Sequence, residues 1–104
     1  MVIGPAFTLD EELVSEFCKR HRIHRLAIFG SALRDDFGPD SDIDLLVEFE
    51  PGATPGLMRL AAMEHELEEL LGGREVEMRT PGDLSRYFRD EIRASAVPVY
   101  DAAA

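Results

Sequence analysis

The sequence contains a single cysteine and no tryptophan, and none of its apolar runs approaches the roughly 18 residues of a membrane-spanning helix. One cysteine, Cys18, cannot form a disulfide within the chain. The first residues, MVIGPAFTLDEEL, lack both the cationic start and the apolar stretch of a signal peptide. We therefore expect a soluble protein of the cytoplasm with no membrane role.

Lysine and arginine are scarce as well. The chain has 11 of them and 21 aspartates and glutamates, which gives a formal net charge of −10. A chain this acidic repels a phosphate backbone unless cations intervene, so direct nucleic-acid binding is not expected. The length of 104 residues and the hydrophobic content of 45% are those of one domain with one modest core. The composition predicts a single domain over residues 1–104.

The first half of the chain predicts one helix and two strands. Thr8 and Glu11 have the spacing of a capping box, which predicts a helix over about residues 9–22. The short apolar run 26–29 is typical of a buried strand and ends at Gly30. Residues 42–50 then alternate, which predicts a half-exposed strand. One face of this strand carries Ile43, Leu45, Val47 and Phe49, and the other carries Asp42, Asp44, Leu46, Glu48 and Glu50.

The second half predicts two helices, a short strand and a final extended edge. Strong helix formers occupy residues 57–71, and Gly72-Gly73 then ends the helix. Residues 75–78 form a short strand, Thr80-Pro81 opens a helix that continues to about Ala94, and residues 97–100 are extended. We expect an α/β (α+β) domain in which a small mixed sheet is covered by helices mainly on one face.

Two acidic residues on the predicted strand are candidates for metal binding. Seven acids fall between Asp35 and Glu50 without a lysine or arginine among them, so their mutual repulsion favours a bound cation. Asp42 and Asp44 project from the same face because they are two residues apart on a strand. Their carboxylates could share Mg²⁺ or bridge two such ions.

A phosphate-binding turn precedes this pair. Gly30-Ser31 ends one strand, and its free backbone N–H groups, together with a residue that lacks Cβ, allow close approach of a phosphate. Glu77, on the third strand, offers another carboxylate that could complete a metal site and help to deprotonate an attacking hydroxyl. If these strands are neighbours, the residues form a metal–triphosphate site for phosphoryl or nucleotidyl transfer.

Gly30-Ser31, ten intervening residues and Asp42-Ile43-Asp44 form the pattern GSx10DxD, which resembles the signature of the DNA polymerase beta-like nucleotidyltransferase superfamily. The stretches FGSALR, PDSDIDLLVEF and EVEMRTPGDLSRYFRDEI, followed by AVPVY, look most like minimal nucleotidyltransferase (MNT) antitoxins. The resemblance covers nearly all of the chain from Leu26 to Tyr100.

The resemblance implies the nucleotidyltransferase fold, Mg²⁺-dependent use of ATP, and pairing with a HEPN ribonuclease toxin. Related antitoxins neutralise such toxins by attaching AMP to a tyrosine. Residue by residue, it implies that Gly30, Ser31 and Arg34 contact the nucleotide, that Asp42 and Asp44 bind metal, and that Glu77 is the third catalytic and metal-binding carboxylate.

Two residues depart from the family pattern. The third carboxylate is usually aspartate, and Glu77 is longer by one methylene. A displacement of about 1 Å in a catalytic group can lower a rate by about a hundredfold, so Glu77 puts the activity in question. Asp35 replaces the glycine that commonly follows the arginine, which adds negative charge beside the proposed phosphate site.

Three hypotheses follow for the function. The first is a protein adenylyltransferase that modifies its partner toxin. The second is a catalytically weak or inactive module of the same fold that neutralises the toxin by binding. The third is a transferase that acts on tRNA or a small molecule, against which the net charge and the short chain both argue.

Other residues allow simpler interpretations. The spacing of Cys18, His21 and His24 invites a zinc site, but these residues straddle a helix end and lack a fourth ligand nearby. Glu77 could be an exposed residue paired with Arg74 or Arg79, and Arg34 could be a surface ion-pair partner. Three aromatic residues near the C-terminus most simply pack in the core, whereas exposed aromatics would suit a partner surface. They are Tyr87, Phe88 and Tyr100.

Overall fold

A computed structural model describes residues 2–3, 7–8, 10–30 and 42–103. Ser31, Arg34 and Asp35 lie outside the described residues. The elements in chain order are β1 (Val2–Ile3), β2 (Phe7–Thr8), α1 (Glu11–Arg20), β3 (Ile23–Phe29), β4 (Ile43–Phe49), α2 (Leu57–Leu70), β5 (Val76–Arg79), the 3-10 turn η2 (Pro81–Asp83), α3 (Arg89–Ser95) and β6 (Val97–Asp101).

Four strands form one mixed sheet in the order β5-β4-β3-β6. β4 and β5 are parallel, while β3 pairs with both β4 and β6 in antiparallel fashion. Strands β1 and β2 pair separately as a small antiparallel ribbon that the sequence did not predict. The mixed α/β fold and each of the four predicted strands of the main sheet are confirmed.

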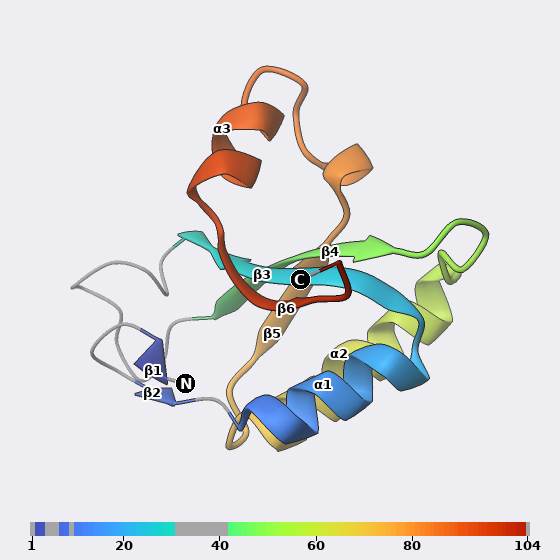
Figure 1. Cartoon of the computed structure of the whole chain (residues 1–104), viewed down its shortest axis with the longest axis vertical. Helices are drawn as coiled ribbons and strands as arrows, with labels where there is room; N and C mark the ends of the chain where they lie inside the picture. Colours follow the sequence, from blue (N-terminus) through green and yellow to red (C-terminus); the bar gives the residue numbers. More distant parts are fainter. Residues whose placement is uncertain (1, 4–6, 9, 31–41, 104) are drawn as a thin grey trace.

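Helices α1 and α2 lie side by side on one face of the sheet, as Figure 1 shows. The core forms between these helices and the sheet because the apolar residues of β4 repeat every second position and those of the helices repeat every three or four. Its buried members include Val14, Phe17, Cys18, Ile23, Leu26, Ile28, Ile43, Leu45, Val47, Met63 and Leu67.

The first helix begins later than the capping box predicted. Asp10 is the N-cap, and its carboxylate accepts hydrogen bonds from the backbone N–H groups of Glu12 and Leu13 at 3.0 and 3.2 Å. Thr8 instead pairs with Val2 in the β1–β2 ribbon, so its backbone is extended and does not enter the helix. An aspartate at this position also adds a favourable charge at the positive end of the helix dipole. The prediction of Thr8 as the cap was wrong.

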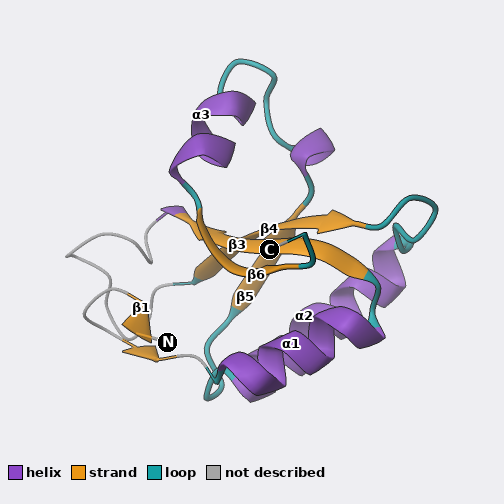
Figure 2. Cartoon of the chain, viewed as in Figure 1, coloured by secondary structure: helices purple, strands orange, loops and turns teal. Residues whose placement is uncertain are grey.

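The predicted helix from Thr80 to Ala94 divides into two short pieces (Figure 2). Thr80 and Asp83 do form a capping box, but the turn that it caps ends at Leu84, which has extended backbone angles. No residue of η2 or α3 is buried. A helix of this length is marginal without burial of an apolar face, which explains why the continuous helix does not form.

No helix in the described ranges is both long enough and apolar enough to cross a bilayer.

Candidate active site

The polar face of β4 points away from α1 and α2, toward the face of the sheet that we call the open face. Ile43, Leu45 and Val47 are buried in the core, so the alternate residues Asp44, Leu46 and Glu48 belong to the open face. Leu46 is nonetheless buried, which differs from the expectation of a half-exposed strand. Its neighbours include Ala27 in the strand ladder, and the connection between β5 and β6 passes over this face.

Asp44 and Glu77 are direct partners in the parallel ladder between β4 and β5. Their side chains share a hydrogen bond. Burial raises the pKa of Asp44 above its ordinary value, the negative charges of Glu77 and Asp42 raise it further, and the positive charge of Arg79 opposes them. The site therefore concentrates negative charge that a cation would relieve.

Gly30 lies against the Asp44 carboxylate. A Cβ atom at Gly30 would stand 2.6 Å from Asp44 Oδ2, and the φ angle of Gly30 is +75°, a conformation that favours glycine. Phe29, the preceding residue, pairs with Asp44 across the β3–β4 ladder. In this structure the space left by the missing Cβ is taken by the Asp44 side chain, which the sequence did not indicate.

Asp42 is exposed and immediately precedes β4. Its charge acts on Asp44, since it contributes to the raised pKa of that carboxyl. The structure thus brings together Gly30, Asp42, Asp44 and Glu77, the four sequence-predicted site residues that it describes. Ser31 and Arg34, the two further residues assigned to the nucleotide, are outside the described ranges.

Within the described part of the chain, no three His, Cys, Asp or Glu side chains surround a common point suited to a metal ion. Mg²⁺ in phosphate sites is usually held by one or two carboxylates together with substrate phosphates and water, not by a cage of protein ligands. Asp42 and Asp44 provide hard oxygen donors of this kind, and the pKa of Asp44 is raised in part by neighbouring carboxylates. These residues fit Mg²⁺ that arrives with a nucleotide.

Comparison with known proteins identifies the family. A sequence profile described as "Nucleotidyltransferase domain" matches residues 10–99. The chain belongs to this family.

Two curated relatives of this nucleotidyltransferase chain carry the name protein adenylyltransferase. It is 40% identical over 80 residues to "Putative protein adenylyltransferase MJ0435" of Methanocaldococcus jannaschii, covering 77% of this chain and 83% of the relative. It is 39% identical over 59 residues to "Protein adenylyltransferase MntA" of Thermococcus cleftensis, covering 57% of this chain and 58% of the relative.

Solved structures agree with the fold. One described as a "putative minimal nucleotidyltransferase" superposes with a TM-score of 0.69 at 39% identity, covering 85% of this chain and 87% of that chain. Another, described as a toxin-antitoxin with AMP-PNP, has a TM-score of 0.71 at 15% identity and covers 89% and 74%. The second match supports the nucleotidyltransferase fold alone.

In this nucleotidyltransferase domain, Glu77 forms an ion pair with Arg79, two residues further along β5. This contact agrees with the simpler interpretation of Glu77 as a paired strand residue. It also holds the Glu77 carboxylate beside Asp44, since both are on the open face. The two interpretations of Glu77 are therefore compatible.

The zinc interpretation of Cys18, His21 and His24 does not fit the nucleotidyltransferase domain. Cys18 is fully buried, and burial raises the pKa of its thiol to about 12, so the thiol stays neutral. His21 Nε2 lies 2.9 Å from Glu66 Oε2, and its ring packs on Phe17 at 4.6 Å between centroids. His21 therefore links the end of α1 to α2, and the three residues form no metal cluster within the part of the chain that the structure describes.

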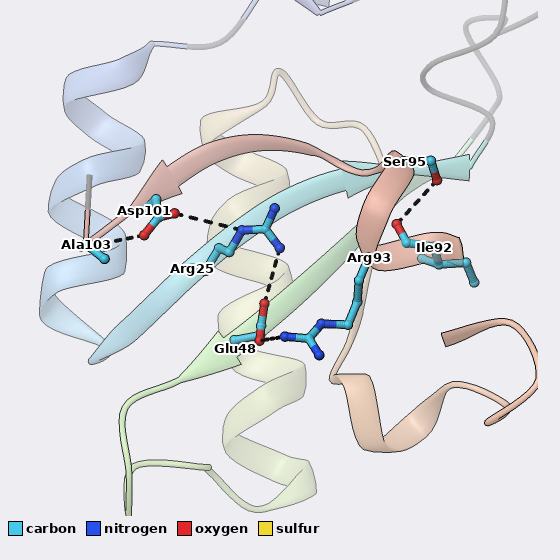
Figure 3. Close-up of polar contacts among 7 residues, drawn as sticks. All are labelled: Arg25, Glu48, Ile92, Arg93, Ser95, Asp101 and Ala103. Carbon is cyan, nitrogen blue, oxygen red and sulfur yellow. Dashed lines mark hydrogen bonds and ion pairs between the residues drawn. The ribbon is translucent and has the colours of Figure 1, made fainter. Parts of the chain in front are cut away.

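Sequence reasoning missed a network of charged residues on the open face (Figure 3). Glu48 accepts hydrogen bonds from Arg25 Nη1 at 3.3 Å and from Arg93 Nη2 at 3.0 Å. Arg25 Nε lies 4.0 Å from Asp101 Oδ2. The network links β4, β3, α3 and β6. Only the place of Glu48 on the same predicted strand face as Asp44 could have indicated it.

The expectation that Tyr87 and Phe88 pack in the core was wrong. Tyr87 is 77% exposed and Phe88 is 58% exposed, whereas Tyr100 packs against the core as predicted. Both exposed residues lie in the turn between η2 and α3, where the chain stands away from the sheet.

Proposed function

We propose that this protein is the antitoxin of a toxin–antitoxin pair and that it transfers AMP from ATP to a hydroxyl group of its partner toxin in a Mg²⁺-dependent reaction. The observation that carries the proposal is the meeting of Gly30, Asp44 and Glu77 at one end of three adjacent strands of a nucleotidyltransferase sheet. Helices α1 and α2 occupy the opposite face of the sheet, so neither of them lies between this site and an acceptor that approaches from the open face.

In the proposed reaction the acceptor oxygen attacks the α-phosphorus of ATP, the bond to the bridging oxygen breaks, and pyrophosphate leaves. Asp42 and Asp44 would hold Mg²⁺, which when bound screens phosphate charge and stabilises the leaving group. Glu77 would accept the proton of the acceptor hydroxyl. Gly30, Ser31 and Arg34 would contact the triphosphate.

The nature of the partner rests on the relatives. Curated relatives carry the name protein adenylyltransferase, and one solved neighbour is a toxin–antitoxin complex with a nucleotide analogue. We propose a HEPN-type toxin as the partner and a tyrosine as the modified residue, as the family resemblance implies. A hydroxyl on a protein suits a domain of this size, because the acceptor brings its own recognition surface.

A specific observation favours the alternative, a module that neutralises the toxin by binding without turnover. The Glu77 carboxylate forms an ion pair with Arg79, so it must leave this contact before it can accept the proton of an acceptor hydroxyl. In that case the protein binds the toxin and nucleotide without transferring AMP.

Incubation with radiolabelled ATP, Mg²⁺ and the protein encoded by the neighbouring gene tests the two functions. The enzyme labels the partner, and Asp42→Ala and Asp44→Ala each abolish the label. The exposed residue Glu69 on α2 provides a matched control, and Glu69→Ala should leave labelling unchanged. A tight complex without label on the partner would support the binding module.

A further inference from the structure

We infer that residues 84–89 form the surface on which the acceptor protein docks, an inference that rests on the proposed function and names where its partner binds. The surface consists of exposed Arg86, Tyr87 and Phe88, together with half-buried Leu84 and Arg89. It belongs to the chain segment 80–96, which we call the crossover arm.

The topology places the crossover arm on the open face. β5 and β6 are the two edge strands of the sheet, about 14 Å apart across three strand spacings. The arm that joins them must cross the sheet, and α1 and α2 occupy the other face. It ends beside the site, because Val97 pairs with Ile28, one residue before the partner of Asp44.

The arm buries little of its own surface. No residue of η2 or α3 is buried, and Ala96, at the end of the arm, is the first buried residue after Met78. A helix of seven residues is only marginally stable unless it buries an apolar face. Within the described chain, α3 has no buried residue. The adjacent aromatic residues Tyr87 and Phe88 are exposed to solvent, which is typical of a surface that a binding partner covers.

A charged contact holds the arm at the sheet (Figure 3). Arg93 of α3 donates to Glu48, which lies four residues from Asp44 on the same face of β4, about 13 Å along the strand. Glu48 is held in turn by Arg25 of β3. These contacts of Glu48 therefore fix the position of the crossover arm, and with it Tyr87 and Phe88, relative to Asp44.

Charge selects the kind of partner. Residues 84–89 contain no acid, and Arg86 is the exposed arginine among them, because Arg89 is half-buried and donates to the Leu84 carbonyl. The Arg86 guanidinium lies 5.1 Å from the centre of the Tyr87 ring and donates to Tyr87 Oη at 3.1 Å, so cation and ring present one surface. This surface fits an apolar recess rimmed by carboxylates on the acceptor protein.

The test uses isothermal titration calorimetry to measure how tightly this protein binds the protein encoded by the neighbouring gene, in the absence of ATP. Tyr87→Ala/Phe88→Ala should weaken this binding by tenfold or more, as expected for aromatic residues at the centre of an interface. Arg86→Glu should also weaken it, and more strongly at low salt. Leu13→Ala and Lys19→Glu, on α1 at the opposite face, are the matched controls and should leave binding unchanged.

Each variant is also titrated with ATP and Mg²⁺ to show that the nucleotide site is intact. Unchanged acceptor binding by both surface variants would overturn the docking proposal, and so would absence of binding by the original protein. Loss of binding to a fluorescent single-stranded RNA in Arg86→Glu, with acceptor binding unaltered, would assign the surface to RNA instead. Acceptor binding that depends on Tyr87 and Phe88, without AMP transfer, would preserve the docking surface and reject the proposed catalysis.

Discussion

Asp44 and Glu77 stand opposite each other in the parallel ladder of β4 and β5 and share a hydrogen bond between their carboxyl groups. Two carboxyl groups in this relationship are unfavourable without a cation or a proton, because burial and the charge of Glu77 both raise the pKa of Asp44. The arrangement therefore costs folding stability in the metal-free protein. Such a cost is typical of sites that are organised for ligand binding.

Asp44→Asn should raise the melting temperature of the metal-free protein by a few degrees, because it removes a partly buried charge beside Glu77. The same variant should abolish AMP transfer. Thermal unfolding followed by circular dichroism, with and without Mg²⁺ and ATP, measures the first effect. A lower melting temperature in the metal-free variant would contradict the electrostatic account of the site.

Gly30→Ala should lower stability by more than the cost of a positive φ angle alone. That cost is about 1–2 kcal/mol for a residue with a Cβ. The added Cβ would also meet Asp44 Oδ2 and displace the carboxylate. Gly52→Ala is the matched control, because Gly52 has a φ of +77° and no atom within 4 Å of the added Cβ. If urea unfolding shows that the two variants lose the same free energy of unfolding, contact with Asp44 does not contribute to the loss.

Glu77→Gln should reduce AMP transfer by about a hundredfold or more, because the amide cannot accept the proton of the acceptor hydroxyl. Glu77→Asp restores the residue that the family resemblance implies and should keep or raise the transfer rate. Single-turnover labelling of the partner protein measures both rates. Equal rates for Glu77→Gln and the original protein would remove Glu77 from the chemistry and leave it as the ion-pair partner of Arg79.

Stability should fall at acidic pH in a way that depends on Glu66. Burial alone would raise the pKa of Glu66, but hydrogen bonds from His21 and Arg20 outweigh it and lower the pKa. A lowered pKa in the folded state gives stability that is present above the ordinary glutamate value and is lost as pH falls through the folded value. Glu66→Gln should therefore be less stable by about 1 kcal/mol at pH 7 and close to the original protein once the pH falls below the lowered pKa of Glu66.

The control for Glu66→Gln is Glu69→Gln, on the same helix but exposed to solvent. Urea unfolding at several pH values compares the two. If the free energies of unfolding of Glu66→Gln and the original protein differ by the same amount at every pH, the charge of Glu66 does not contribute to stability.

Most of the sheet could be predicted from local patterns. The apolar run before Gly30 and the alternation from Asp42 to Glu50 each reflect a property of the strand backbone, so neither depends on distant contacts. Helix α2 was predicted for the same reason, since its ends coincide with helix formers and the Gly72-Gly73 stop. The candidate site residues also came from spacing, and two residues on one strand face must project together.

Contacts between distant segments could not be predicted in this way. Thr8 and Asp10 are both capping residues, and pairing of Thr8 with Val2 decided between them. The predicted helix after Thr80 divides at Leu84, whose backbone is extended, and neither of the two pieces contains a buried residue. The contacts of Glu48 with Arg25 and Arg93 join residues 23 and 45 positions apart, which no local pattern records.

The sequence by itself determined the four strands of the main sheet, the helices α1 and α2 and the choice of acidic residues for the site, because periodicity and spacing act within a few residues of chain. Only the tertiary structure decided that Glu77 stands beside Asp44, that Gly30 makes room for that carboxylate, and that Tyr87 and Phe88 remain in water. These relationships depend on the order and register of the strands, which are set when the whole sheet packs against the helices around one core.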